Sequence, residues 1–272
     1  MGKIIGVAAE KGGVAKTTTV KNVAVGLVNL GKKVLTVDLD PSGLLTKTFG
    51  IYIEEKPLDA NNPEEAAGIC EIFRRSIQGI DIPVGYKIVH QAEGIDIITS
   101  TERLRDYEMQ MISAFQREVM LRNYLEPLRE MYDYIFIDCP AGLGILTINA
   151  LFCADELILP LQPHFASVES TQSLFRLIAN IRRMRRGKRP EILGLLFTMV
   201  RTTTNNDIQI MERMKSDFRE KLPVFDTFIP LSTNFPESDL ARQSVYKHAK
   251  NSSAAMICDD LIKEILMREE NL

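Results

Sequence analysis

The sequence predicts an α/β fold, in which a doubly wound, mostly parallel sheet of seven to eight strands carries helices on both faces. Two observations lead to this prediction. Short apolar runs alternate with helical patterns along the whole chain. Most of these runs are continuously apolar, as is typical of strands that are covered on both faces. The predicted strands are Lys3–Ala9, Lys33–Asp38, Ile95–Thr99, Tyr134–Asp138, Glu156–Leu161, Ile192–Met199 and Val224–Ile229.

The segments between the strands predict helices and one irregular region. Lys16–Leu30 has apolar residues at helical spacing and ends before Gly31, which predicts a C-cap. Ser167–Met184 repeats the pattern. Ile51–Gly94 is irregular around a short helix near Glu64–Gln78, and we interpret it as an elaboration between strands. Residues 1–272 are therefore expected to form one domain, without an N-terminal helix-turn-helix module.

Composition excludes several classes of protein. The chain has 272 residues, of which 45% are apolar and 25% charged, as in soluble globular proteins. The 33 Lys and Arg against 36 Asp and Glu give 33 − 36 = −3, so any DNA contact must come from a local basic patch. No apolar run approaches the ~18 residues of a membrane-spanning helix, and the first residues do not resemble a secretory signal. Four scattered cysteines without a C-x-x-C pair predict reduced thiols and a cytoplasmic location.

A glycine-rich segment follows the first strand. Residues 10–19 read E-K-G-G-V-A-K-T-T-T and open a helix, so backbone N–H groups and the helix dipole favour a bound phosphate there. Lys16 is expected to reach the β- and γ-phosphates, and the Thr17 hydroxyl to bind Mg²⁺. Glu10 and Ala15 stand where a standard G-x-x-x-x-G-K-T loop has glycines. If residue 15 needs a positive φ, alanine costs ~1 kcal/mol or more there, and weaker nucleotide binding or slower turnover is expected.

Residues 11–18, K-G-G-V-A-K-T-T, resemble the deviant Walker A motif of the ParA/MinD group of P-loop ATPases, closest to the chromosomal and plasmid ParA (Soj-like) partition proteins. The resemblance implies ATP and Mg²⁺ as cofactors. It also implies that the first lysine crosses an ATP-sandwiched dimer interface to the phosphates of the partner subunit, as an arginine finger does elsewhere. The implied nucleotide-binding residues in this loop are Lys11, Gly12, Gly13, Val14, Ala15, Lys16, Thr17 and Thr18.

Acidic residues follow two of the predicted strands, at the edge where open α/β sheets bind ligands. The segment Asp38-Leu39-Asp40-Pro41-Ser42-Gly43 is similar to the family's D-x-D-P-Q-G. The resemblance implies that Asp40 orients the attacking water and that Asp38 helps to hold the Mg²⁺ shell. Residues 138–144, D-C-P-A-G-L-G, resemble the Walker B region, so that Asp138 would bind a Mg²⁺-ligating water. The predicted catalytic residues are thus Lys11, Lys16 and Asp40, and the predicted metal site is Thr17, Asp38 and Asp138.

The family also suggests where the base and the DNA would bind. Adenine is expected near Met199 and Pro230, at two strand ends. The family stretch R-N-V-R-L-S-E-A after I-P is L-S-T-N-F-P-E-S here, so both of its arginines are missing. Residues 182–189, with 6 basic residues in 8, are the densest alternative, but cations that complement a helix C-terminus explain this cluster equally well. The candidate DNA-contacting residues are Arg182, Arg183, Arg185, Arg186, Arg242, Lys247 and Lys250.

The resemblance implies an ATP-dependent homodimer that binds non-specific DNA and is released when a ParB-like partner stimulates hydrolysis. Such a protein would act in chromosome or plasmid partition or in cargo positioning, and it would be associated with the nucleoid. The alternative is a MinD-like regulator on a membrane or a protein scaffold, docked through a C-terminal helix at 254–272. From Asp259 onward this tail carries 5 acids against Lys263 and Arg268, which anionic lipid would repel, so we expect the helix to pack on the sheet without stable membrane association. A third alternative is an iron–sulfur protein or a small ATP-dependent ligase. An iron–sulfur cluster that bridges a dimer needs two suitably placed cysteines in each subunit, but Cys139 lies next to the Walker B region and Cys153 lies in a predicted buried helix, so we do not expect a shared cluster.

Overall fold

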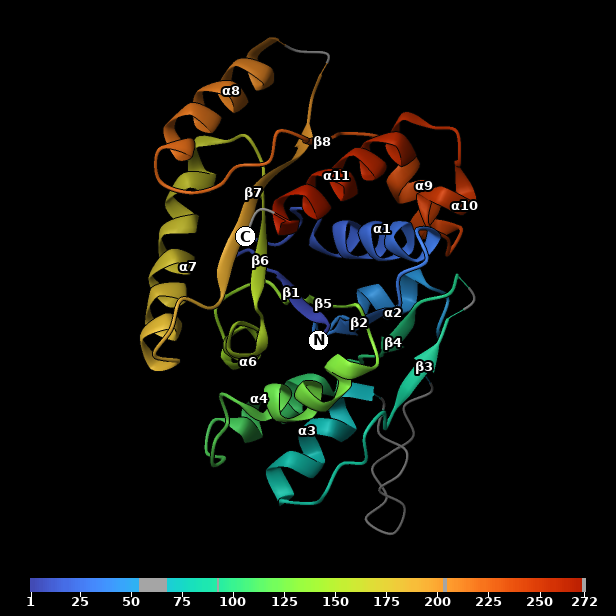
Figure 1. The fold of residues 1–272 in the computed structure, drawn as a ribbon, viewed down its shortest axis with the longest axis vertical. Helices are drawn as coiled ribbons and strands as arrows, with labels where there is room; N and C mark the ends of the chain where they lie inside the picture. The colour runs from blue at the N-terminus through green and yellow to red at the C-terminus, as the bar shows by residue number, and fades with distance from the viewer. Residues whose placement is uncertain (54–67, 92, 203–204, 271–272) are drawn as a thin grey trace.

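The computed structural model describes residues 1–53, 68–91, 93–202 and 205–270. Eight strands form one sheet in the order β3-β4-β2-β5-β1-β6-β7-β8 (Figure 1), and all neighbours are parallel except β3 and β4. This confirms the predicted fold class. The strands are β1 Lys3–Val7, β2 Val34–Asp38, β3 Ile88–His90, β4 Asp96–Ile98, β5 Tyr134–Asp138, β6 Glu156–Leu161, β7 Glu191–Val200 and β8 Ile229–Pro230.

Helices cover both faces of the sheet because the central strands are apolar on both sides. In β1, Ile4 faces one buried core and Ile5 faces the other. The first core includes α3 Gly68–Gln78, α4 Leu104–Met111, α5 Met120–Leu125, the 3-10 helix η2 Glu126–Glu130, α6 Ile145–Cys153, α7 Phe165–Met184 and α8 Asn205–Arg219. The second core includes α1 Lys16–Asn29, α2 Leu44–Thr48, α9 Asn234–Leu240, α10 Val245–His248 and α11 Ser253–Glu270.

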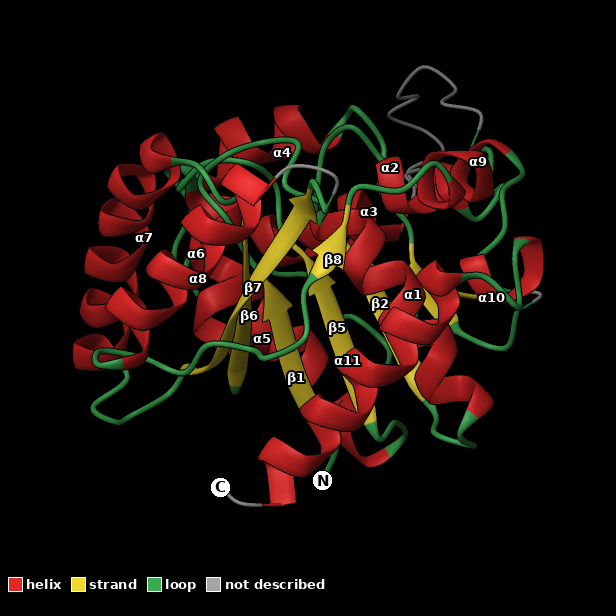
Figure 2. Ribbon diagram, turned by 90° about the horizontal axis from the view of Figure 1, so that it is seen from above, coloured by secondary structure: helices red, strands yellow, loops and turns green. Residues whose placement is uncertain are grey.

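The strand order brings distant loops together at one edge of the sheet. Strand β1 lies between β5 and β6, and β2 lies on the far side of β5. The parallel strands end at the same edge, with α2 and α9 beside it and the amino terminus at the opposite edge (Figure 2). Loops that follow β1, β2, β5, β6 and β7 therefore meet there, as is usual for the ligand site of an open α/β sheet.

The predicted strand Val224–Ile229 is wrong over most of its length. Only a single bridge from Val224 to Leu195 and the two-residue strand β8 form. Side chains of α11 form hydrogen bonds with the backbone groups that would otherwise pair with a neighbouring strand. The Glu264 carboxylate accepts the N–H groups of residues 226 and 227 at 2.8 and 2.9 Å, and Arg268 donates to the carbonyl of Val224 at 2.6 Å.

The irregular region contains one strand that the sequence analysis missed. Ile88–His90 pairs antiparallel with β4 at the sheet edge. Its side chains are half-buried or exposed, so it lacks the apolar run that marks the other strands. The predicted helix Glu64–Gln78 appears as α3 from Gly68, and residues 64–67 of that prediction lie outside the described residues.

The C-terminal helix packs against the protein, as predicted. Leu261 and Ile265 of α11 are fully buried in the core that α11 shares with α1. Within the described part of the chain, no helix is long and apolar enough to cross a membrane.

Candidate nucleotide-binding site

Residues 8–15 connect β1 to α1 and contain the predicted phosphate loop, which begins at residue 10. Ala15 has φ 60° and ψ 30°, so the position does require the left-handed conformation that glycine adopts most easily. The loop is held from two neighbouring strand ends. Gln162, after β6, donates to the Gly13 carbonyl at 3.2 Å, and Thr198 of β7 donates to the Val14 carbonyl at 3.1 Å. The sequence analysis placed Thr198 near the base, and it did not predict that Thr198 or Gln162 would bond the loop.

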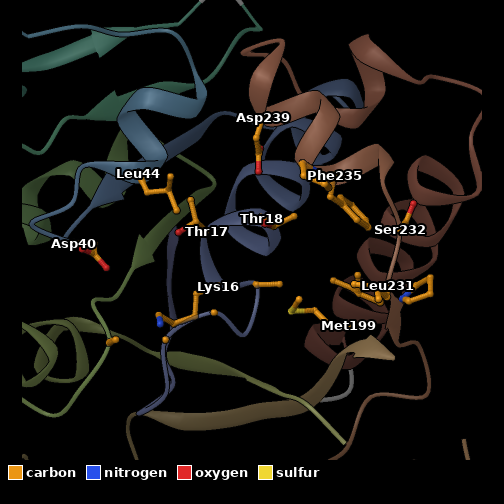
Figure 3. A pocket seen from close by; sticks show the side chains of 17 residues that line it. Lys16, Thr17, Thr18, Asp40, Leu44, Met199, Leu231, Ser232, Phe235 and Asp239 are labelled. Carbon is orange, nitrogen blue, oxygen red and sulfur yellow. The ribbon is translucent and has the colours of Figure 1, made fainter. Parts of the chain in front are cut away.

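A pocket of about 370 Å³ opens beside this loop (Figure 3). Loop residues and the start of α1 line one end, and residues from β7, β8 and α9 line the other. The described residues around it are Gly12, Gly13, Ala15, Lys16, Thr17, Thr18, Asp40, Leu44, Ala141, Met199, Ile229, Pro230, Leu231, Ser232, Phe235, Pro236 and Asp239. Two other loop residues do not line the pocket: Lys11 is exposed, and the Val14 side chain is buried.

Thr17 and Asp138 meet at the phosphate end. The Thr17 hydroxyl donates to Asp138 Oδ2 at 2.7 Å. Asp138 Oδ1 is buried and has no hydrogen-bond partner among the described residues. The pairing of β2 with β5 sets Asp38 directly opposite Asp138. Burial, together with the Asp38 carboxylate, raises the pKa of Asp138 well above its usual range, and burial raises the pKa of Asp38 to about 6. Two adjacent buried carboxylates with an unpaired oxygen fit a cation site.

Asp38 is braced by residues that the sequence analysis missed. Thr46 of α2 donates to Asp38 Oδ2 through its hydroxyl at 2.6 Å and its N–H at 2.8 Å. The Thr46 hydroxyl accepts the N–H of Ser100 at 3.0 Å, and the Ser100 hydroxyl donates to the Asp40 carbonyl at 2.9 Å. Residues after β4 thus support the loop that follows β2. The Asp40 side chain reaches the pocket on the side of Lys16 (Figure 3).

Lys16 is buried at the loop, and its ammonium lies 3.3 Å from the carbonyl oxygen of Lys11. The other end of the pocket is mainly apolar. Met199 projects at a break in the register of β7 and β8, with φ 54°. Pro230, Leu231 and Phe235 lie near it. The predicted base-binding residues Met199 and Pro230 therefore share one pocket with the phosphate loop.

Comparison with known proteins agrees with this geometry. A family model described as an AAA domain matches residues 2–192. The sporulation initiation inhibitor protein Soj of Bacillus subtilis is 34% identical, over 97% of this chain and 98% of that protein. The chromosome partitioning protein ParA of Myxococcus xanthus is 32% identical, over 87% of this chain and 78% of its own length. The chain belongs to the ParA/MinD family of P-loop ATPases.

Solved structures of family members and relatives have the same fold. A structure described as cobyrinic acid a,c-diamide synthase from Mycobacterium smegmatis, with bound ATP analogue and magnesium, matches with a TM-score of 0.80 at 26% identity, covering 98% of this chain and 94% of that one. The cell division ATPase MinD of Pyrococcus furiosus matches with a TM-score of 0.73 at 23% identity, covering 98% and 99%, which shows the fold alone.

The basic residues considered for DNA binding in this ParA/MinD-family chain fall into two groups. The first group, residues 182–189, begins in the last turn of α7 and continues beyond it. Arg182 donates to the Pro190 carbonyl at 2.8 Å, and Arg185 donates to the Ala154 carbonyl at 2.6 Å. Both acceptors lie before the strands β7 and β6, so this group sits at the edge opposite the pocket. Arg185 is half-buried and has a structural partner, whereas Arg183 and Arg186 are exposed.

The second group follows α9. Arg242, Lys247 and Lys250 are exposed. The Arg242 guanidinium stacks over the Tyr52 ring, 4.6 Å from its centroid. The backbone N–H of Val245 donates to the Asn22 side chain of α1 at 2.9 Å, so this segment is tied to the helix that begins at the phosphate loop.

Proposed function

We propose that the chain is a ParA-type ATPase that dimerises with ATP, binds non-specific DNA as the dimer, and acts in chromosome or plasmid partition or in cargo positioning. A ParB-like partner would stimulate hydrolysis and release it from DNA. The observation that supports this most directly is the pocket. It is lined by the phosphate loop and Thr17, which bonds Asp138, and its other end is the apolar end at Met199. Family membership supports the partition role.

The chain's own groups suit the binding of a nucleotide. The Lys16 ammonium would reach the β- and γ-phosphates from beside the Lys11 carbonyl. Asp40 would orient the attacking water, as the family resemblance implies. Lys11 is exposed, which suits a lysine that serves the partner subunit's phosphates in a homodimer.

The same edge fits Mg²⁺. Thr17 Oγ1 and the unpaired Asp138 Oδ1 are hard oxygen donors, and Asp38 adds negative charge beside them. Mg²⁺ usually needs only one or two carboxylates together with phosphates and water. This agrees with the described residues, which contain no cluster of three or more His, Cys, Asp or Glu able to hold a metal. When bound, the ion would neutralise charge on the transferred phosphoryl group.

Two alternatives lose support. The MinD-like alternative needs an apolar helix face free for lipid, but the apolar side of α11 is buried against α1. The iron–sulfur alternative needs accessible cysteine thiolates to hold a cluster between two subunits. Cys139 and Cys153 are fully buried, and burial raises the pKa of both thiols, to about 12 in Cys153.

The test is binding to random double-stranded DNA with ATP, with ADP and without nucleotide, over a salt series. We expect binding with ATP alone, with affinity that falls steeply as salt rises. Asp40→Ala should trap the ATP dimer on DNA and abolish turnover, whereas Asp260→Asn, at an exposed acid of α11, should behave as the parent protein. DNA binding that is equal in all three nucleotide states, or normal turnover in Asp40→Ala, would contradict the proposal.

A further inference from the structure

One acidic side chain in the pocket wall has no role in the proposed hydrolysis. Among the described residues that line the pocket, the charged ones are Lys16, Asp40 and Asp239. Lys16 and Asp40 lie at the phosphate end. Asp239, from α9, points into the pocket near Thr18, between the phosphate end and the apolar end at Met199 and Leu231 (Figure 3).

A carboxylate in a site for a polyanionic nucleotide is unfavourable unless a cation balances it. Lys21 supplies that cation. Its side chain is fully buried, and its ammonium lies 2.6 Å from Asp239 Oδ1 and 2.7 Å from the Gln243 carbonyl. Lys21 lies on α1, about one turn beyond Thr17 and Thr18. The ion pair therefore fixes the position of Asp239 relative to the phosphate loop.

The Asp239 carboxylate keeps capacity to bind a ligand. Lys21 contacts Oδ1, 31% of the Asp239 side chain remains exposed, and Asp239 is one of the residues that line the pocket. An ionised carboxylate only accepts hydrogen bonds. The part of a nucleoside triphosphate that separates the phosphates from the base is the sugar, whose hydroxyl groups are donors.

We infer that Asp239 accepts a hydrogen bond from a ribose hydroxyl of the bound nucleotide and makes the site select ribonucleotides over deoxyribonucleotides. The inference rests on the proposed ATP site. A nucleotide that lacks this hydroxyl would leave the carboxylate desolvated without a donor, and sites built around a hydroxyl discriminate strongly for that reason. Because the acceptor is charged, we expect a loss of affinity of about tenfold or more.

The experiment measures equilibrium dissociation constants for ATP, 2′-deoxy-ATP and 3′-deoxy-ATP in the presence of Mg²⁺. Each displaces ATP labelled on its γ-phosphate, so that the label does not touch the sugar. We expect the parent protein to bind at least one deoxynucleotide about tenfold more weakly than ATP. In Asp239→Asn this difference should shrink to about twofold, because the amide is a weaker acceptor than the carboxylate. Asp260→Asn, a matched change on an exposed surface, should keep the full difference.

The result that overturns the inference is a parent protein that binds ATP and both deoxynucleotides within about twofold, or undiminished discrimination in Asp239→Asn. If Asp239→Asn fails to fold because it leaves Lys21 poorly paired, the double variant Lys21→Met/Asp239→Ala removes both charges and must lose the discrimination instead. A parent protein that fails to bind ATP at all would overturn the ATP site itself. Binding of ATP without discrimination would overturn the sugar contact alone.

Discussion

At residue 15 the backbone of the phosphate loop is left-handed, yet the residue is alanine. Gly13, two positions earlier, also has a positive φ, of 71°. A Cβ at a left-handed position costs ~1–2 kcal/mol, so this loop keeps its shape against local strain. The strain is offset by the bonds that Gln162 and Thr198 make to the loop carbonyls.

Ala15→Gly should therefore stabilise the loop. We expect the free energy of unfolding to rise by up to ~1 kcal/mol, since relief of strain outweighs the added freedom of the unfolded chain. ATP should bind more tightly. Urea unfolding and direct nucleotide titration measure the two effects. Ala179→Gly, at an exposed position inside α7, is the matched control and should lower stability by ~0.5–1 kcal/mol. A loss of stability in both variants would show that residue 15 is not strained.

The Asp38 carboxylate depends on Thr46 for its position. Thr46→Val keeps the shape of the side chain but removes the hydroxyl that bonds Asp38 and accepts the Ser100 N–H. Because two buried polar groups lose a partner, we expect the free energy of unfolding, measured in urea, to fall by ~1–3 kcal/mol. In the same helix, Thr48→Val removes only a bond to the Leu45 carbonyl and should cost less. Equal losses in the two variants would count against the bracing role of Thr46.

At the scale of elements, the segment after α8 shows where sequence patterns mislead. Residues 224–229 are apolar and β-branched enough to predict a strand, but α11 supplies hydrogen bonds that replace the ladder. Tertiary partners outweigh local preference in such a segment. By contrast, β5 and β6 form over the predicted ranges, and their residues are buried on both faces.

The Glu264 carboxylate holds this segment in place, so Glu264→Gln should lower the free energy of unfolding by ~2 kcal/mol near pH 7. Burial alone would raise the pKa of Glu264, but hydrogen bonds from the N–H groups of residues 227 and 226 and from Arg268 outweigh it and lower the pKa. A lowered pKa contributes stability above the unfolded value of about 4.3, and that stability is lost as the pH falls through the folded value. The difference between parent and variant should therefore shrink under acid conditions.

Chemical unfolding at several pH values between 3 and 7 checks this expectation. Glu270→Gln, at an exposed site on the same helix, is the control and should change stability little at any of these pH values. A difference between the parent protein and Glu264→Gln that stays constant down to pH 3 would mean that the carboxylate charge does not stabilise the loop.

At the scale of the whole molecule, the two basic groups lie in different places relative to the pocket. The group at 182–189 is at the opposite edge of the sheet, and Arg182 and Arg185 bond backbone carbonyls there. Lys247 and Lys250 lie beyond α9, which lines the pocket, on a segment bonded to α1. If DNA binding depends on nucleotide, the second group is the better candidate for the DNA contact, because α1 and α9, which hold it, both line the pocket.

Neutralising Lys247 and Lys250 together to Gln should weaken ATP-dependent DNA binding and reduce the slope of log affinity against log salt by about 2, one unit for each lost phosphate contact. Arg183→Gln/Arg186→Gln is the matched pair, exposed at the other edge, and should leave that slope nearly unchanged. Gel-shift or anisotropy titrations over a salt series provide the measurement. The opposite pattern would move the DNA surface to the end of α7.

The sequence by itself determined the family and the sheet, and it predicted which loop residues and acidic residues would lie at the candidate site. These signals are local: a loop motif between strand and helix, and acids at the ends of apolar runs whose parallel pairing brings them to one edge. Only the tertiary structure decided which side chains brace and complete that edge. Lys21 and Asp239 are 218 residues apart in the chain, and Ser100 is 54 residues from Thr46. Such contacts depend on how α1, α2, β4 and α9 pack, and no local pattern in the sequence encodes that packing.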